Sequence, residues 1–294
     1  MSIADVPVES AGALRAGRTE VRRELLRELG HSPTFLVGAT ILLIWIICAI
    51  FGSAIAPHSP YAQNLEGINK APSSAHLFGT DQLGRDMFSR VIVGARDILI
   101  IAPLATLLGT VLGTAIGLVM GYFRGFVDDV LGRFVEAFLA IPLVVTGVIA
   151  LATLGHSNLV IIIVIGLVFT PLIARTVRAA VLLERELDYV AAARLRGEGA
   201  SYIMFVEILP NVLAPITVEF TVRLGYAVFA VATLSFLGLG IQPPSSDWGL
   251  EVATNYGQVD AGFWWEVVFD ALAIASLVVA VNLISDAIEG VFER

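Results

Sequence analysis

Long uncharged runs alternate with short charged segments along this chain, and their lengths match those of membrane crossings. A helix rises about 1.5 Å per residue, so about 20 apolar residues cross a hydrocarbon layer about 30 Å thick. The runs Phe35 to Ala56 and Ile98 to Tyr122 each reach that length without one charged side chain. The same pattern predicts six spans, at about residues 34–56, 97–121, 133–154, 158–179, 213–239 and 266–289.

The composition supports an all-α integral membrane protein. Of the 294 residues, 57% are hydrophobic and 15% are charged, whereas soluble domains are about 45–50% apolar and about 25% charged. A soluble fold could not cover that much apolar surface. The formal net charge of −8 also argues against a nucleic-acid partner, because phosphate backbones require clustered Lys and Arg.

The distribution of arginine predicts the side on which each connection lies, because short cytoplasmic loops carry an excess of Lys and Arg. Arginines gather before the first span and between spans four and five, whereas segments 155–158 and 240–265 contain none. With six spans, this pattern places both termini in the cytoplasm. Segment 57–96, which carries Lys70 and three arginines, is the one exception on the outer side.

These segments divide the chain into four parts. Residues 1–33 form a cytoplasmic tail with an amphipathic helix at Thr19–Leu29, and residues 34–96 comprise the first span and an extracytoplasmic segment. Residues 97–289 form a five-span core with a cytoplasmic loop at 180–212, and residues 290–294 form a cytoplasmic C-terminus. The first span is expected to be retained, because a long polar tail precedes it and no small-residue cleavage site follows it.

Residues suited to catalysis or metal binding are sparse. The single cysteine, Cys48, lies inside the first span, which excludes an internal disulfide and predicts a packing role. The sequence has no Walker-type phosphate loop, no Gly-x-Ser-x-Gly elbow and no His-Glu-x-x-His helix. Its four histidines are isolated and are expected at surfaces, although His58 and His76 share one segment and leave metal handling as a less favoured alternative. We therefore expect a non-enzyme that itself binds no metal or cofactor.

Charged side chains inside the predicted spans are few, and each should face protein or water because an ionised group at the bilayer centre is costly. Glu219 and Arg223 lie four residues apart and are predicted to pair on one helical face, either at a pathway wall or at a subunit interface. Glu136 lies near the inner end of span three, where it can reach the headgroup region. Asp270 is expected to be solvated near the outer end of span six.

The segment from Glu184 to Pro215 is longer and more patterned than a connection between two spans requires. Strong helix formers predict a helix over Tyr189–Arg196, and its three consecutive alanines, 191–193, give a smooth face that another protein can approach closely. Gly197 is expected to end this helix, because glycine accepts the left-handed conformation found at helix C-termini.

A second short helix is expected after this glycine. Ser201 is predicted to cap it, and its body is predicted over Tyr202–Leu209. Pro210 is expected to help end it, because proline lacks the backbone N–H that a helix interior needs.

The order Ala-Ala, then Gly197, then Leu209-Pro210 resembles the EAA loop of ABC-importer permeases, whose short coupling helix docks into a cleft on the ATPase subunit. Ala191 stands where that pattern begins with Glu, a substitution common in the peptide-permease branch. The resemblance implies an ATPase-coupling role for Asp188, Tyr189, Ala191, Ala192, Ala193, Arg194, Gly197, Leu209 and Pro210.

Three further motifs are similar to those of the C-type subunit of dipeptide and oligopeptide permeases. Residues 77–81 (LFGTD), followed by Gly84-Arg85-Asp86, resemble the long segment after its first span. Residues 234–244, with Trp248-Gly249, resemble its fifth span and the outer loop that follows. Asn282 and Asp286 fit its terminal helix, so the similarity covers about residues 35–289.

This resemblance implies a type I ABC-importer permease fold in a prokaryotic cytoplasmic membrane. It implies four kinds of partner besides the lipid bilayer: a second, B-type permease, two ATP-binding subunits and an extracytoplasmic substrate-binding protein. ATP and magnesium would bind to the ATPase subunits and not to this chain.

Peptides are the expected cargo, and nickel, heme or glutathione, carried by importers of the same branch, are the alternatives. A self-sufficient secondary transporter is disfavoured, because the sequence shows neither inverted repeats nor a central polar site. A membrane-bound assembly or receptor protein would leave the 180–212 loop unexplained.

Overall fold

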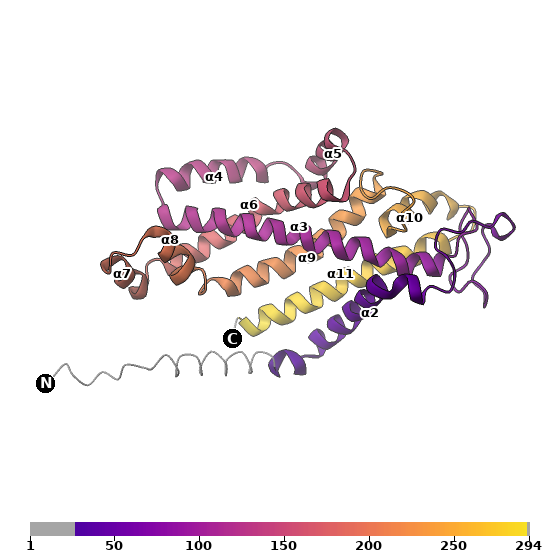
Figure 1. The fold of residues 1–294 in the computed structure, drawn as a ribbon, viewed down its shortest axis with the longest axis horizontal. Helices are drawn as coiled ribbons and strands as arrows, with labels where there is room; N and C mark the ends of the chain where they lie inside the picture. Colours follow the sequence, from indigo (N-terminus) through magenta and orange to yellow (C-terminus); the bar gives the residue numbers. More distant parts are fainter. Residues whose placement is uncertain (1–26, 293–294) are drawn as a thin grey trace.

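The computed structural model describes residues 27–292, and helices dominate that part of the chain (Figure 1). The longer helices, in chain order, are α2 (Pro33–Ile55), α3 (Met87–Phe123), α4 (Phe126–Leu139), α5 (Leu143–Leu154), α6 (Asn158–Glu184), α7 (Asp188–Leu195), α9 (Leu213–Phe236), α10 (Trp248–Asn255) and α11 (Trp265–Phe292). Short helical turns are η1 (Leu65–Gly67), α8 (Ala200–Tyr202), η2 (Ile203–Ile208) and η3 (Tyr256–Gln258). The amphipathic helix expected at Thr19–Leu29 lies mostly outside the described residues.

Five helices among the described residues are long and apolar enough to cross a membrane: α2, α3, α6, α9 and α11. The number rises to six if α4 and α5 count as one span, but these two helices are bent by 85° relative to each other. The span predicted at 133–154 is therefore not one continuous helix. Pro142 explains the break, because it lies directly before α5 and proline cannot continue a preceding helix.

α3 is much longer than its predicted span. α3 begins at Met87, not near residue 97, because Asp86 caps it by accepting a hydrogen bond from the Ser89 backbone N–H. Its first turns contain Arg90 and Arg96, so this part of the helix does not belong to an uncharged run. The structure therefore moves residues 87–96 from the expected extracytoplasmic segment into a helix that continues the second span.

α3 and α6 lie side by side at the centre of the molecule (Figure 1), and glycines bring their backbones close together. A Cβ atom built at Gly113 would lie 2.8 Å from the Thr170 carbonyl oxygen, and one at Gly117 would lie 2.7 Å from that of Ala174. Spacing of small residues by four places them on one helical face, which is a common way of packing membrane helices. The other large helices complete the core around this pair, and half-buried Cys48 packs against it as predicted.

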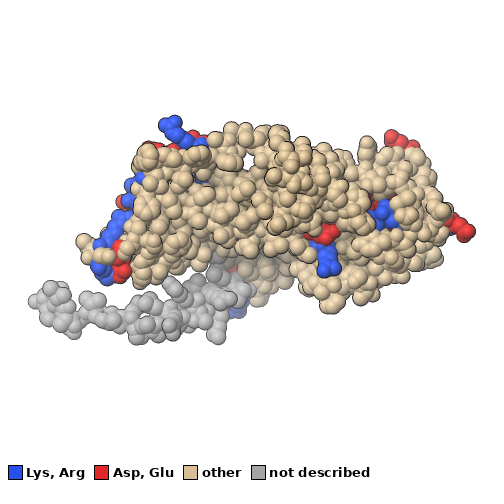
Figure 2. Space-filling model, turned by 45° about the horizontal axis from the view of Figure 1, so that its top comes forward, with Lys and Arg blue, Asp and Glu red and all other residues tan. Residues whose placement is uncertain are grey.

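The molecule has two distinct ends along its long axis. α7 and α8 lie at one end, called here the α7 end, and α10 lies with segment 57–86 at the other, called the α10 end (Figure 1). On the face drawn in Figure 2, charged side chains gather toward the two ends, and the broad middle is largely free of them. This arrangement fits a protein whose middle lies in hydrocarbon and whose ends lie in water.

Candidate functional site

The expected helix between α6 and α9 is present as α7, and Gly197 ends it as predicted. Gly197 has a φ of 78°, in the left-handed region that glycine accepts most readily. Its N–H donates to the Arg194 carbonyl at 3.0 Å, and the next N–H, of Glu198, donates to the Ala193 carbonyl at 3.2 Å. These two bonds form a Schellman motif, which satisfies carbonyls that would otherwise lack partners at the helix end.

Two side chains of α7 fix the helix to the rest of the protein. Val190 and Ala193 are fully buried and belong to the main hydrophobic core. The Tyr189 hydroxyl donates to Glu184 Oε2 at 3.0 Å, and burial raises the pKa of Tyr189, so this proton stays in place at neutral pH. The Arg194 guanidinium lies 5.5 Å from the centre of the Tyr122 ring, at the end of α3.

The opposite face of α7 is exposed and largely apolar. Asp188, Ala191 and Ala192 all lie on it. Leu195, which the sequence analysis did not single out, is 90% exposed. Leu195 and the two alanines therefore give this face small and apolar side chains at its centre.

The second short helix begins earlier than predicted. Gly199, not Ser201, precedes its first residue, and the Ser201 side chain makes no capping hydrogen bond. The helix then continues as the wider turn η2, which ends before Leu209. Leu209 packs against the core, and Pro210 is exposed in the turn before α9. Neither residue is part of α7 or of its exposed face.

The predicted pair in span five forms. Arg223 donates from Nε to Glu219 Oε1 at 2.6 Å, and the two side chains are 19% and 12% exposed. The Arg223 guanidinium also lies 5.5 Å from the ring centre of Tyr226, which is exposed. Glu136 does not join this pair: it is exposed on α4, and α3 and α6 lie between α4 and α9 (Figure 1).

Glu136 instead lines a polar groove between α4 and α6. Arg178 of α6 donates from Nε and Nη2 to the two carboxylate oxygens of Asp128 on α4, at 2.5 and 2.6 Å. A paired contact of this kind holds both side chains in one orientation. Sequence spacing does not predict this contact, because its partners lie in different helices.

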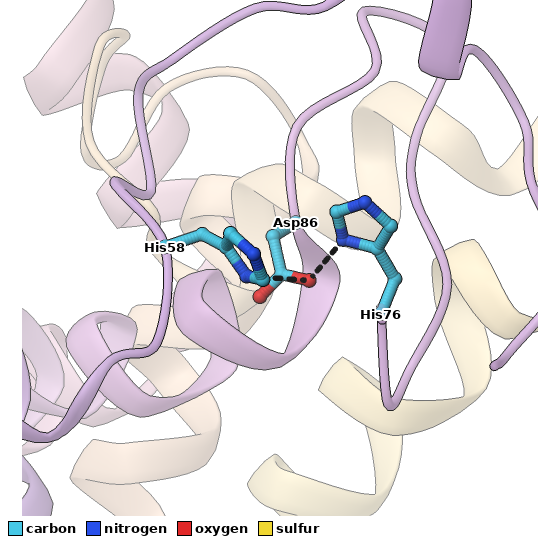
Figure 3. A group of neighbouring side chains, drawn as sticks. All are labelled: His58, His76 and Asp86. Carbon is cyan, nitrogen blue, oxygen red and sulfur yellow. Dashed lines mark hydrogen bonds and ion pairs between the residues drawn. The ribbon is translucent and has the colours of Figure 1, made fainter. Parts of the chain in front are cut away.

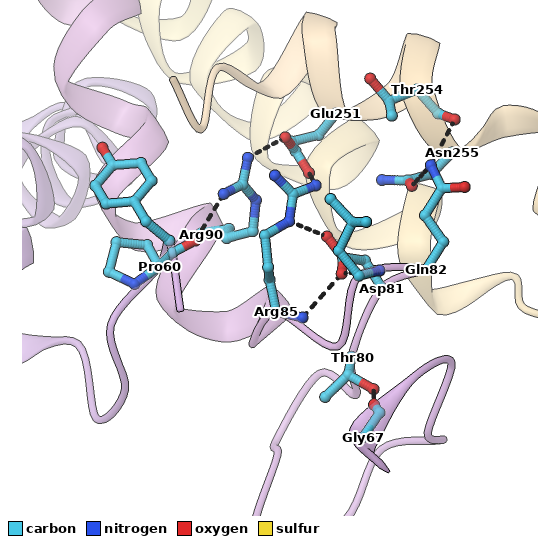
Figure 4. Close-up of polar contacts among 12 residues, drawn as sticks. Pro60, Gly67, Thr80, Asp81, Gln82, Arg85, Arg90, Glu251, Thr254 and Asn255 are labelled. Carbon is cyan, nitrogen blue, oxygen red and sulfur yellow. Dashed lines mark hydrogen bonds and ion pairs between the residues drawn. The ribbon is translucent and has the colours of Figure 1, made fainter. Parts of the chain in front are cut away.

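A buried polar cluster, also missed, lies at the α10 end (Figure 4). Arg90 of α3 is fully buried and donates to Glu251 of α10, to the Ser245 carbonyl and to the Pro60 carbonyl. Arg85 pairs with Asp81 at 2.5 Å. Arg85 also lies 3.8 Å from Glu251, and the Trp248 indole N–H donates to the Val91 carbonyl of α3 at 2.8 Å. The segments that carry the motifs at 84–86 and 248–249 therefore meet in space.

Several carboxyl groups beside this cluster are buried. Asp270 is 0% exposed, so the expectation that it is solvated is wrong. Both oxygens of Asp270 and of Glu266 are buried and have no hydrogen-bond partner among the described residues. Other parts of the protein at the α10 end cover the Glu266 and Asp270 side chains of α11. The sequence of α11 alone does not predict this burial. Burial raises the pKa of Asp247, which caps α10, to about 6.

Comparison with known proteins covers nearly the whole chain. Residues 113–294 match the family described as "binding-protein-dependent transport system inner membrane component". Residues 22–72 match the N-terminal TM domain of oligopeptide transport permease C. The first match includes α7 and α10, and the second includes α2.

Individual relatives agree with these matches. The chain is 40% identical over 259 residues to the dipeptide transport system permease protein of Escherichia coli, covering 86% of each protein. It is 34% identical over 272 residues to the di/tripeptide transport system permease protein of Pseudomonas aeruginosa, covering 90% of this chain and 89% of that protein. It is 33% identical over 263 residues to the dipeptide transport system permease protein of Bacillus subtilis, covering 90% and 82%.

Proposed function

This chain belongs to the family of binding-protein-dependent transport system inner membrane components, and we propose that it transmits the motion of an ATPase to a peptide pathway through α7. It is a multi-pass permease of the prokaryotic cytoplasmic membrane and a member of the dipeptide and oligopeptide permease branch. ATP hydrolysis takes place in partner subunits in this proposal.

The structure of α7 supports this role. A coupling element must be fixed to the spans, so that force applied to it moves them, and must also present a surface to its partner. Val190 and Ala193 provide the first property, because they are buried in the core. The exposed face with Ala192 and Leu195 provides the second. The ATPase then shifts the equilibrium between two conformations of the permease. The size of this shift is set by the difference between the free energies with which the ATPase binds the two conformations.

The remaining partners follow from the family. We expect a second, B-type permease, two ATP-binding subunits carrying ATP and magnesium, and an extracytoplasmic binding protein that delivers the cargo. Peptide cargo is proposed because relatives over nearly the full length are named as dipeptide and di/tripeptide permeases. Glu219 and Arg223 keep 12% and 19% of their side chains exposed, and in this proposal that exposed part faces the second permease, at the interface or at the pathway wall.

The single observation that carries the proposal is the exposed, small-residue face of a helix with a buried opposite face. Replacing Ala192 by Trp places a large side chain on that face without entering the core. We expect the assembled importer to lose at least about tenfold in uptake and in transport-linked ATP hydrolysis, equivalent to roughly 1.4 kcal/mol of docking preference. Uptake and ATPase rates are measured in liposomes that contain the complete complex.

Ala261→Trp provides the matched control, because Ala261 is also exposed but belongs to the α10 end. This variant should insert and keep its ATP-linked uptake. Gly197→Trp is a second test, but it acts differently, because its φ of 78° strains any side chain and disturbs the helix end itself. Normal uptake by fully assembled Ala192→Trp complexes would rule out α7 as the coupling element.

A further inference from the structure

Two histidines and one aspartate converge at the α10 end, so the expectation of isolated histidines is wrong for His58 and His76. His58 follows α2 by three residues, His76 lies in segment 57–86, and Asp86 caps α3. The two imidazole rings lie 4.9 Å apart between their centres. Figure 3 shows both rings beside the Asp86 carboxylate.

The three side chains offer ligand atoms that lie close together. Nδ1 of His76 is 2.8 Å from Asp86 Oδ1, and Nδ1 of His58 is 3.7 Å from the same oxygen. One potential ligand atom from each residue lies within 4.8 Å of the others. In a tetrahedral site with metal–ligand distances of about 2.0–2.2 Å, neighbouring ligand atoms are separated by about 3.3–3.6 Å. The two distances to Asp86 lie on either side of that separation, and all three ligand atoms lie within 4.8 Å of one another, so rotations of the side chains would bring them around one ion.

The carboxylate is held in position by contacts that leave one oxygen to face the rings. Oδ2 of Asp86 accepts hydrogen bonds from the Ser89 backbone N–H at 2.9 Å and from Ser89 Oγ at 2.6 Å. The His58 backbone N–H donates to the same Ser89 Oγ at 3.2 Å, which places His58 against the start of α3. Metal-binding carboxylates are commonly oriented by hydrogen bonds of this kind.

Exposure provides a route for an ion to enter. The Asp86 side chain is 2% exposed, whereas those of His76 and His58 are 23% and 46% exposed. The carboxylate therefore forms the base of the cluster, and the imidazoles form its open side. A hydrogen bond to Asp86 explains the position of the His76 ring. It does not explain the position of the His58 ring, because the 3.7 Å between His58 Nδ1 and Asp86 Oδ1 is too long for a hydrogen bond.

We propose that His58, His76 and Asp86 bind one divalent cation of the zinc class. Two imidazole nitrogens and one carboxylate oxygen suit zinc and its neighbours such as nickel and copper, whereas magnesium and calcium prefer sets of oxygen ligands. Water would occupy the fourth position. The ion joins the end of α2, segment 57–86 and the start of α3, and so fixes this segment to the spans independently of the cargo carried.

The site is tested with zinc alone on the purified full chain, prepared with a histidine-free affinity tag and treated with a chelator. Calorimetry and elemental analysis after dialysis should show one tightly bound zinc per chain, and zinc should raise the unfolding temperature. Excess magnesium or calcium should neither displace the zinc nor reproduce the rise. Wild-type protein that binds no zinc under these conditions would overturn the proposal.

Three variants separate metal binding from folding. His58→Ala should weaken zinc binding at least tenfold and remove most of the rise in unfolding temperature. Asp86→Asn keeps the ability to cap α3, because Asn caps as well as Asp, but removes the anionic ligand and should weaken binding likewise. His156→Ala is the control, because His156 is exposed and its Nδ1 contacts the Leu239 carbonyl, outside the cluster. Equal zinc binding by the His58 and His156 variants would overturn the assignment.

Discussion

Arg90 is the only fully buried Lys or Arg side chain among the described residues, and its surroundings are strongly acidic. It is 0% exposed and pairs with Glu251, which is 2% exposed. Asp247, Glu266 and Asp270 are buried nearby, and the last two have no hydrogen-bond partner among the described residues. The positive charge of Arg90 therefore compensates more than one carboxyl group, and its loss should cost more than the loss of a single surface ion pair.

Replacing Arg90 by Met should lower the free energy of unfolding by about 3–5 kcal/mol, because it leaves Glu251 buried without its partner. The double variant Arg90→Met, Glu251→Leu should recover part of that loss, because neither charge then remains. Arg196→Met is the matched control: Arg196 is 53% exposed and pairs with Glu207 at 2.9 Å, so its loss should cost at most about 1 kcal/mol. Unfolding of the purified variants in one detergent measures all three.

Equal stability of the Arg90 and Arg196 variants would show that water or other groups already compensate the buried carboxylates. A double variant less stable than Arg90→Met would show that Glu251 is needed for its own packing and not for the pair.

The contrast between two ion pairs shows what a sequence reveals at this scale. Glu219 and Arg223 are four residues apart, and a helix brings such residues together whatever the rest of the fold does, so their pairing was predicted correctly. Arg90 and Glu251 are 161 residues apart, and only the packing of α3 against α10 brings them together. The same reason explains why the burial of Asp270 and the meeting of His58 with His76 were missed.

At the scale of helices, the contact between α3 and α6 depends on glycines that no apolar pattern distinguishes. Four of them, at positions 109, 113, 117 and 121, recur at every fourth residue and face α6. At Gly117 an added Cβ would meet the Ala174 carbonyl oxygen and the Val177 Cβ, both at 2.7 Å. Both contacts are with the backbone or with a branched carbon of a packed helix, which cannot move aside cheaply.

Gly117→Ala should therefore lower the free energy of unfolding by roughly 1–3 kcal/mol, although alanine is the better helix former. The control is Gly132→Ala in α4, where the added methyl would meet only the end of the Met120 side chain at 3.7 Å. That variant should be as stable as the wild type or more so. Unfolding midpoints and the amount of protein inserted in the membrane measure both, and similar stability of the two variants would contradict close packing along this face.

The lengths and breaks of the helices were predicted only in part, for identifiable reasons. α2, α6, α9 and α11 begin within one residue of their predicted positions. α3 was predicted too short, because Arg90 and Arg96 interrupt its apolar run while other parts of the protein enclose Arg90. The bend between α4 and α5 follows from Pro142, which the search for a continuous span did not use.

For the whole molecule, the two ends carry different chemistry. The α7 end carries the proposed coupling surface, and the α10 end carries a buried ion-pair cluster with the proposed metal site beside it (Figures 3 and 4). The start of α2 and the end of α11 lie toward the α7 end (Figure 1). If α7 meets an ATPase, both of these helix ends must therefore be cytoplasmic, as the arginine distribution also predicts.

The sidedness can be measured with single cysteines in a Cys48→Ala background. Ala192→Cys and Ala261→Cys each place a thiol at an exposed position, one at the α7 end and one at the α10 end. With the chain expressed without an ATPase that could cover α7, a membrane-impermeant maleimide should label position 192 only in inside-out vesicles and position 261 only in right-side-out vesicles. Detergent should make both thiols reactive, which controls for their intrinsic accessibility. The opposite labelling pattern would place α7 outside the cell, where no ATP-driven subunit could reach it, and would rule out coupling through this helix while leaving the zinc test unaffected.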